Sequence, residues 1–200
     1  MRRGVAIGDY LQPLDKAPIQ CYLTNVLQVA DVIEWVLEQV GKSTIWQTSF
    51  SISEEFLRRL YFISKSGRVN KIHLVLDFKA TNKTLKLWSF LTQVIEHTYL
   101  ADNHSKVILI QAESGQSVSI VTSQNLTRGN RMESAVVTTD KAVFSVFLAD
   151  MEDLIQNHSV PLTELFNEKV NERTVSADIN THSQHEYDSH LESPSDDAAS

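Results

Sequence analysis

The sequence has 200 residues, of which 42% are hydrophobic and 22% are charged, and its formal net charge at pH 7 is −7. This composition is typical of a globular protein and excludes a fibrous or wholly disordered chain. No apolar run reaches the roughly 18–20 residues that a membrane helix requires, and the first residues lack the apolar core of a secretion signal. A single cysteine, Cys21, excludes an intrachain disulfide framework and a cysteine-cluster metal site. We therefore expect a cytoplasmic protein with no stable membrane association.

The net charge is unevenly distributed along the chain. Residues 171–200 hold seven acidic residues against one arginine, whereas residues 58–131 hold eleven basic residues against four acidic ones. The last part of the chain is rich in Ser, Asp, Asn and Glu and has almost no large apolar residues, so we expect residues 172–200 to form an acidic disordered tail. The basic central stretch is suited to an anionic partner.

The first clear helical pattern lies at residues 31–40. Apolar side chains there fall on one helical stripe, with Asp31 as the expected N-cap and Gly41 as the residue that ends the helix. Residues 43–50 are rich in β-branched and aromatic residues, which predicts a strand.

A second helix is expected next, with Ser51 or Ser53 as its cap. Residues 71–78 have the near-continuous apolar character of a buried strand. Helical spacing returns at residues 83–97, which places His97 at the end of a helix.

Two further strands are predicted at residues 105–111 and 117–123, separated by a turn-like segment. Another strand follows at residues 133–139, and a last helix runs through residues 140–155 with Asp140 as its cap. Strands and helices in this order predict an α/β fold, a mixed β-sheet flanked by helices in a single domain.

Four polar residues near the two adjacent strands stand out. His104 and Lys106 are two residues apart at the head of one strand, and Ser123 and Asn125 are two apart at the end of the next. If the two strands pair as a hairpin, the start of one lies beside the end of the other, and the four side chains converge. An imidazole, an ammonium, a hydroxyl and an amide together suit a tetrahedral phosphate with negative oxygens.

This arrangement resembles half of an active site of the phospholipase D superfamily, whose signature is H-x-K-x(4)-D followed by a G-S-x-N-like turn. The matching residues are His104-Ser105-Lys106, then Thr122-Ser123-Gln124-Asn125, and then Glu133. Upstream, Thr48-Ser49-Phe50 and Val75-Leu76-Asp77 match the T-S-F-like and V-L-D-like segments of the family. The resemblance covers roughly residues 25–157 and implies a phospholipase D-like α-β-α sandwich.

The sequence departs from the family pattern at two positions. Gln111 stands where the motif has its aspartate, and Thr122 stands where the turn has its glycine. The family's aspartate supports the pocket, and its glycine lets the backbone approach closely. Neither departure removes His104, Lys106 or Ser123.

The resemblance also implies domain boundaries. We expect an N-terminal extension at residues 1–24, a phospholipase D-like domain at residues 25–160, and a C-terminal helical extension at residues 161–171. The acidic tail at residues 172–200 follows.

The resemblance implies covalent catalysis without a metal or other cofactor. One histidine attacks phosphorus to form a phosphohistidine, and a second histidine protonates the leaving oxygen and then activates water. Lys106, Ser123 and Asn125 are expected to hold the non-bridging oxygens. Because the chain has a single H-x-K motif, the second histidine is expected from another copy, as in the small homodimeric endonucleases of the family.

Three further residues are assigned supporting roles. Glu133 is expected to orient His104 or the same histidine of the second copy, although a strand-edge carboxylate is an equal alternative. Arg128 and Arg131 are expected to bind substrate phosphates, with solvated loop charges as the alternative. No residue is expected to bind a metal.

The resulting interpretation is a metal-independent phosphodiesterase, and the basic central stretch favours a nuclease that acts on DNA or RNA. The alternatives are a catalytically inactive module that binds nucleic acid or protein, a phospholipid-directed phosphodiesterase, and a helper module of a larger assembly. The changes at Gln111 and Thr122 are the main support for an inactive module.

Overall fold

The computed structural model describes residues 6–167, and the tail expected at residues 172–200 lies outside them. The compact unit that ends at Leu162 is built on one eight-stranded sheet with the order β1-β7-β6-β5-β2-β3-β4-β8. The strands are β1 (Ile19–Thr24), β2 (Ser43–Ser49), β3 (Val69–Asp77), β4 (His97–Ala101), β5 (Val107–Ala112), β6 (Ser117–Thr122), β7 (Glu133–Thr138) and β8 (Ser159–Pro161). β2, β3 and β4 are parallel, and the remaining neighbours pair antiparallel.

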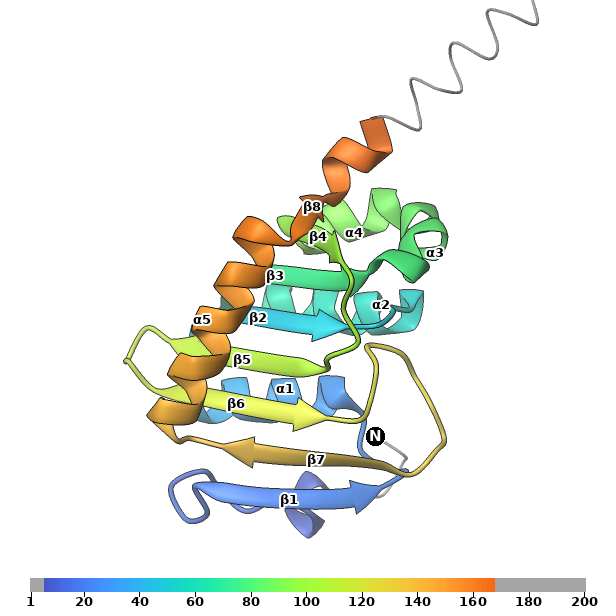
Figure 1. Ribbon diagram of the computed structural model, residues 1–200. Helices are drawn as coiled ribbons and strands as arrows, with labels where there is room; N and C mark the ends of the chain where they lie inside the picture. Colours follow the sequence, from blue (N-terminus) through green and yellow to red (C-terminus); the bar gives the residue numbers. More distant parts are fainter. Residues whose placement is uncertain (1–5, 168–200) are drawn as a thin grey trace, which may run out of the picture. The chain divides into compact units, whose positions relative to one another are not determined.

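Helices cover both faces of this sheet. They are α1 (Val29–Val40), α2 (Glu54–Ile63), α3 (Thr81–Lys86), α4 (Trp88–Val94) and α5 (Lys141–Asn157), with short turns η1 (Ile7–Asp9), η2 (Ser64–Arg68) and η3 (Phe78–Ala80). In Figure 1, α5 crosses one face of the sheet, and α1 and α2 lie against the other. The prediction of a mixed sheet flanked by helices is therefore confirmed. Among the helices of residues 6–167, none has the length and hydrophobicity of a membrane-spanning segment.

The core follows the alternation of side chains along the strands. On one face, Val107 and Leu109 of β5 are buried against Phe144 and Met151 of α5. Ile108, which lies between them, is fully buried and points to the opposite face, which α1 and α2 cover. Apolar residues on both faces explain why β5 shows a continuous hydrophobic run in the sequence.

Three of the predicted helix boundaries are confirmed by hydrogen bonds or backbone angles. The Ser53 hydroxyl accepts a hydrogen bond from Phe56 N–H at 3.2 Å at the start of α2. The Asp140 carboxylate accepts hydrogen bonds from the first turn of α5. Gly41 follows α1 with a φ of 83°, a conformation that favours glycine.

The prediction that Asp31 is the N-cap of the first helix is wrong. α1 begins at Val29, so that Gln28 is the N-cap, and the Asp31 carboxylate accepts a hydrogen bond from Gln28 N–H at 3.0 Å. The helix gains its extra first residues because the side chain of Gln124 accepts a hydrogen bond from Val29 N–H at 2.6 Å. A residue so distant in the sequence is invisible to a local pattern.

The single helix predicted at residues 83–97 is also wrong. Leu87 separates α3 from α4 with ψ near 4°, and Ile95 is already extended. His97 therefore lies in β4, opposite His73 of β3. Parallel pairing with β3 satisfies the backbone of residues 97–101, and this tertiary pairing outweighs the helical periodicity of the sequence.

The structure adds two strands that the sequence patterns did not indicate. β1 comes from the stretch expected to be an N-terminal extension, and it pairs along its whole length with β7. β8 pairs with β4 at the other side of the sheet. Residues 162–167 are helical.

Candidate active site

One edge of the sheet gathers the chain segments that carry the predicted site. β2 and β3 end there at Ser49 and Asp77, and the helices α1 and α2 begin at the same edge (Figure 1). β5 and β6 pair antiparallel with Val107 opposite Val121, and Thr122 N–H donates to the Lys106 carbonyl at 3.0 Å. The predicted hairpin is thus confirmed, and the start of β5 lies beside the end of β6.

His104 lies in the loop between β4 and β5 with an exposed side chain. Its ring contacts the ring of Phe50, with 5.4 Å between the centroids. Lys106 is half-buried, and its Nζ donates a hydrogen bond to the His104 carbonyl at 3.0 Å. The imidazole therefore faces solvent while the lysine ammonium lies close to its backbone.

A buried network fixes the backbone on both sides of His104. Asn103 N–H donates to the Asp77 carboxylate at 3.1 Å, and the Asn103 side-chain oxygen accepts from the Ser105 hydroxyl at 2.6 Å. The Thr48 hydroxyl accepts from Val107 N–H at 3.0 Å and lies 2.7 Å from the Ser105 hydroxyl. Asp77 was predicted to be a strand-end residue, and it occupies that position, where it also accepts from Lys79 N–H.

Ser123 lies directly after β6 and is held by β7. Its hydroxyl donates a hydrogen bond to the Glu133 carboxylate and accepts one from Ser134 N–H at 3.0 Å. Glu133 was expected to orient a histidine, but the contact that the structure shows is with Ser123.

Tyr22 of β1 has a raised pKa. Its cause is burial, and then the nearby carboxylates of Asp31 and Glu133.

Asn125 is half-buried in the turn that follows Ser123. Its side-chain oxygen lies 3.4 Å from the Ser49 hydroxyl, and that hydroxyl also accepts a hydrogen bond from Leu126 N–H at 3.0 Å. Ser49 thus ties the turn to the end of β2. Ser49 was predicted as part of a family-like T-S-F segment, but its contact with Asn125 was not predicted.

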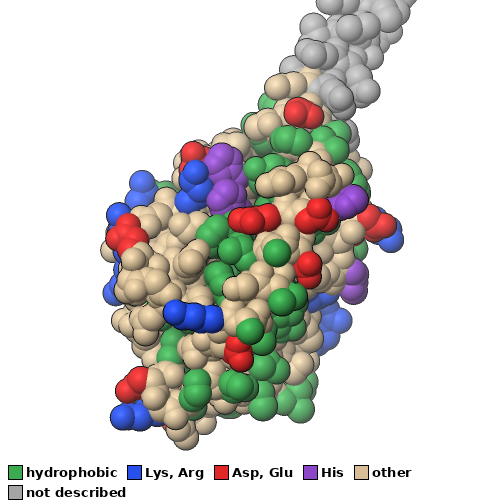
Figure 2. Space-filling view, turned by 60° about the vertical axis from the view of Figure 1, so that its left-hand side comes forward, with side chains coloured by type: hydrophobic (Ala, Val, Ile, Leu, Met, Phe, Trp, Pro, Cys, Tyr) green, Lys and Arg blue, Asp and Glu red, His purple; other side chains and the backbone are tan. Residues whose placement is uncertain are grey.

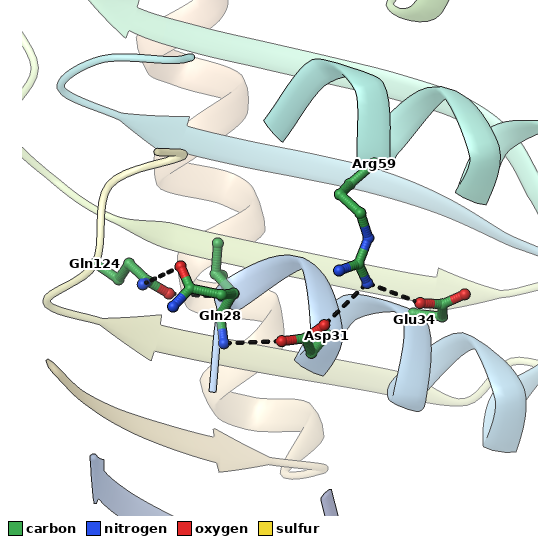
Figure 3. Close-up of polar contacts among 6 residues, drawn as sticks. Gln28, Asp31, Glu34, Arg59 and Gln124 are labelled. Atoms are coloured by element: carbon green, nitrogen blue, oxygen red, sulfur yellow. Dashed lines mark hydrogen bonds and ion pairs between the residues drawn. The ribbon is translucent and has the colours of Figure 1, made fainter. Parts of the chain in front are cut away.

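Gln124, between Ser123 and Asn125, is buried, and its side chain lies against the start of α1 (Figure 3). Its Oε1 accepts from Val29 N–H at 2.6 Å, and its Nε2 donates to the Gln28 side chain at 3.2 Å. Gln28 N–H in turn donates to Asp31, whose carboxylate accepts from Arg59 at 2.9 Å. The turn that carries two predicted site residues is therefore anchored to α1 and, through Asp31, to α2.

The remaining predicted residues lie farther along the loop or away from this edge. Arg128 forms an ion pair with Glu55 at 2.5 Å, and Arg131 is exposed just before β7. Gln111 lies at the opposite end of β5, where it pairs with Ser117 at the turn of the hairpin. Thr122 is buried, and its hydroxyl donates to the Ser134 carbonyl at 3.0 Å, so its extra bulk forms part of the β6–β7 contact.

The positive surplus of residues 58–131 is partly neutralised by acids from elsewhere in the chain. The pairs are Arg58–Glu54, Arg59–Asp31, Arg59–Glu34, Arg68–Glu38 and Arg128–Glu55. Lys79, Lys83 and Lys86, which follow the end of β3, are exposed and form no ion pair within residues 6–167. Within the same residues, no cluster of three or more His, Cys, Asp or Glu side chains is arranged to hold a metal ion.

No protein-family model and no curated protein matches the sequence. Solved structures do match the fold. Nuc from Salmonella typhimurium, described as a phospholipase D family member, has a TM-score of 0.55 and 18% identity over 72% of this chain and 96% of its own. NucT from Helicobacter pylori has a TM-score of 0.52 and 12% identity over 70% of this chain and 96% of its own.

Polyphosphate kinase from Porphyromonas gingivalis also matches, with a TM-score of 0.50 and 11% identity over 72% of this chain. This chain covers 24% of the kinase, whereas it spans nearly the whole length of Nuc and NucT. At these identities, the likeness describes the fold alone.

Proposed function

The chain has the fold of the phospholipase D superfamily, and from this premise we propose that it is a metal-independent phosphodiesterase that cleaves nucleic acid as a homodimer. The observation that carries the proposal is the backbone pairing of β5 and β6, which puts the segment of His104 and Lys106 beside the segment of Ser123 and Asn125 at one edge of the sheet. An imidazole, an ammonium, a hydroxyl and an amide are the groups that phosphoryl transfer to histidine needs.

The proposed reaction has two steps. A ring nitrogen of His104 attacks phosphorus and forms a P–N bond, while the P–O bond to the leaving group breaks and the leaving oxygen takes a proton from the second histidine. That histidine then accepts a proton from water, the resulting hydroxide attacks phosphorus, and the P–N bond breaks to release a phosphate monoester. Lys106, Ser123 and Asn125 stabilise the negative oxygens in both steps.

The environment of His104 supports this role. The network of Thr48, Asp77, Asn103 and Ser105 holds the backbone around it, while its ring remains accessible to a large substrate. Glu133 accepts the Ser123 hydroxyl hydrogen bond and thereby fixes the direction of that hydroxyl. Rigid placement of this kind lowers the reorganisation that the transition state requires.

The second histidine requires a second copy of the chain, and the sheet offers a surface for it. Val121 and Val136 lie in register with Val107, which packs on α5, so they share the face that carries α5. Leu23 of β1 is 68% exposed and Val146 of α5 is 61% exposed on the same face. Figure 2, in which the left-hand side of Figure 1 comes forward, shows hydrophobic side chains gathered in its lower half. Exposed apolar area of this kind favours association of two copies.

The charge pattern favours nucleic acid as the substrate. Lys79, Lys83, Lys86 and Arg131 are exposed and lie in segments that leave or enter the sheet at the edge of His104. Unpaired cations along such an edge attract a polyanion and release its counterions. Gln111, which departs from the family motif, lies at the far end of β5 and is therefore distant from the four proposed catalytic groups.

The decisive experiment measures hydrolysis of bis(p-nitrophenyl) phosphate and of single-stranded DNA in the presence of EDTA. We expect activity from the wild-type chain and a loss of at least about 1,000-fold in His104→Ala. His158→Ala is the matched control, because His158 is an exposed histidine at the end of α5, and its activity should equal that of the wild type.

A phosphorylated enzyme that is labile to acid and stable to base should accumulate on rapid quenching of the wild type alone. The proposal fails if the wild-type chain hydrolyses neither substrate, if EDTA abolishes the activity, or if His104→Ala retains it. Binding of DNA without hydrolysis would instead indicate an inactive binding module.

A further inference from the structure

A pocket of about 250 Å³ opens beside the candidate active site, between the first turns of α1 and α2 and the loop that joins β6 to β7. Val29 and Phe56 are buried among its lining residues, and Phe62 contributes an aromatic ring that is 71% exposed. Asn130 and Thr127 of the loop supply polar groups. The pocket therefore combines apolar walls, one accessible ring and hydrogen-bonding side chains.

The charges around this pocket are already balanced. Arg59 is bound by Asp31 and Glu34, Arg128 by Glu55, and Arg58 by Glu54. Each arginine that lines the pocket thus has a carboxylate partner, which reduces its attraction for a phosphate group. The pocket suits an uncharged, planar group with polar edges better than an anion.

The accessible ring of Phe62 strengthens this assignment. Most of the Phe62 side chain is in contact with water. A planar ligand that stacks on its ring removes this apolar surface from water, which favours binding. Bases of single-stranded nucleic acids bind aromatic side chains in this way, whatever their sequence, because every base has a π-face. Amide side chains such as Asn130 bind the hydrogen-bonding edges of bases.

The pocket lies within reach of the proposed reaction. Asn125 and Arg128 are three positions apart in the loop, so their Cα atoms are at most about 11 Å apart. The loop is held against the start of α2, because Ser53 N–H donates to the Leu126 carbonyl at 3.0 Å. The pocket residues Thr127 and Arg128 therefore lie in the same short loop as Asn125, which we propose to hold the scissile phosphate.

We propose that this pocket receives the base of a nucleotide adjoining the scissile phosphate. The inference rests on the proposed phosphodiesterase function and identifies the part of the substrate, other than phosphate, that the chain recognises. Recognition is by stacking and by amide contacts, and it distinguishes diesters that carry a base from those that carry none.

The test compares two diesters with the same leaving group, thymidine 5′-(p-nitrophenyl) phosphate and methyl p-nitrophenyl phosphate, of which only the first carries a base and only the first has a planar group besides the leaving group. The quantity compared is the kcat/KM of the thymidine diester divided by the kcat/KM of the diester without a base. We expect Phe62→Ala to lower this ratio about fivefold or more. Asn130→Ala, a second variant at an exposed position, should lower the ratio in the same direction. Tyr10→Ala changes an exposed aromatic residue outside the pocket and should leave the ratio unchanged.

A binding measurement separates this inference from the proposed function. Thymidine titrated into the full chain should shift the amide resonances of residues 127–130 and of the first turn of α2, whereas inorganic phosphate should not. If the wild type hydrolyses neither diester but these shifts occur, the phosphodiesterase proposal fails and the base pocket stands. If the kcat/KM ratio is the same in Phe62→Ala and the wild type, or if thymidine at millimolar concentration causes no shift, the pocket does not bind a base.

Discussion

The side chain of Gln124 caps helix α1, since its Oε1 accepts a hydrogen bond from Val29 N–H at 2.6 Å. Gln124 stands between Ser123 and Asn125, so the same residue that begins a helix also fixes the turn of the candidate active site. The orphan N–H groups of a helix start are normally satisfied by the residue just before it. Here a distant loop satisfies the first of them, Val29 N–H, beside the local contact between Gln28 and Asp31, and this couples helix stability to site geometry.

Replacement of this cap should therefore affect both properties. Gln124→Met keeps a similar volume but removes the hydrogen bonds to Val29 and Gln28, and we expect it to lower the free energy of unfolding by about 1–2 kcal/mol. Diester hydrolysis should fall as well, through kcat. Urea unfolding and kinetics measure the two effects. Gln93→Met, at an exposed glutamine of α4, is the control and should change neither. A stable variant with full activity would show that the cap is dispensable.

Gln47 of β2 should respond in the opposite direction to replacement. Its side chain is fully buried, and neither its Oε1 nor its Nε2 has a hydrogen-bond partner among the described residues. A buried amide without partners costs free energy, so we expect Gln47→Leu to raise the free energy of unfolding by about 1–3 kcal/mol. Urea unfolding measures the change. Gln39→Leu is the control with opposite sign, because Gln39 accepts a hydrogen bond from Leu14 N–H and donates one to Trp35. Destabilisation by Gln47→Leu would contradict the prediction.

His73 should make the fold sensitive to acid. It is stacked between Trp46 and His97, with ring centroids 5.5 and 5.1 Å away. Burial, and then the neighbouring charges of His97 and Lys71, lower the pKa of His73 from 6.5 to about 4. The unfolded chain therefore binds a proton on the His73 ring more tightly than the folded chain does. As a result, the free energy of unfolding has its full value above about pH 6.5 and decreases as the pH falls toward 4.

Thermal unfolding across this pH range measures the effect of His73. We expect His73→Leu to remove about 1–3 kcal/mol of the pH dependence of the free energy of unfolding between pH 6.5 and 4. His158→Leu, at an exposed position, should leave the pH dependence as in the wild type. An unchanged slope in His73→Leu would show that the histidine titrates normally in the folded chain.

The exposed apolar face of the sheet should determine the oligomeric state. Leu23 lies on the face that carries α5, and a lysine there would lose its hydration when a second copy covers it. Because burial of an unpaired charge costs free energy, Leu23→Lys should convert a dimer to a monomer. Light scattering at micromolar concentration measures the mass, and activity should fall with dimer content because the second histidine is lost. Phe62→Lys alters an equally exposed apolar residue of α2, on the other face, and should remain dimeric. A wild-type chain that is monomeric at this concentration would contradict the proposed assembly.

Local patterns were sufficient for the parts of the fold in which neighbouring residues decide the structure. The β5–β6 hairpin joins segments separated by a short turn, and its pairing follows from apolar and β-branched strand residues and a glycine with a φ of 87° at Gly115. The caps Ser53 and Asp140 are likewise set by bonds to residues two or three positions away. Local patterns failed at His97, where pairing with β3 outweighed helical spacing.

Local sequence patterns are enough to show which chemical groups are present and to place His104, Lys106, Ser123 and Asn125 at the ends of adjacent strands, because hairpin geometry is local. How those groups are held depends on the three-dimensional fold. Gln124 reaches α1, Ser49 reaches Asn125, and Arg128 reaches Glu55 through contacts between segments far apart in the chain. The same long-range contacts pair much of the positive charge that the sequence places at residues 58–131. Net charge depends on composition alone, but the charge that a substrate meets depends on which side chains the fold brings together.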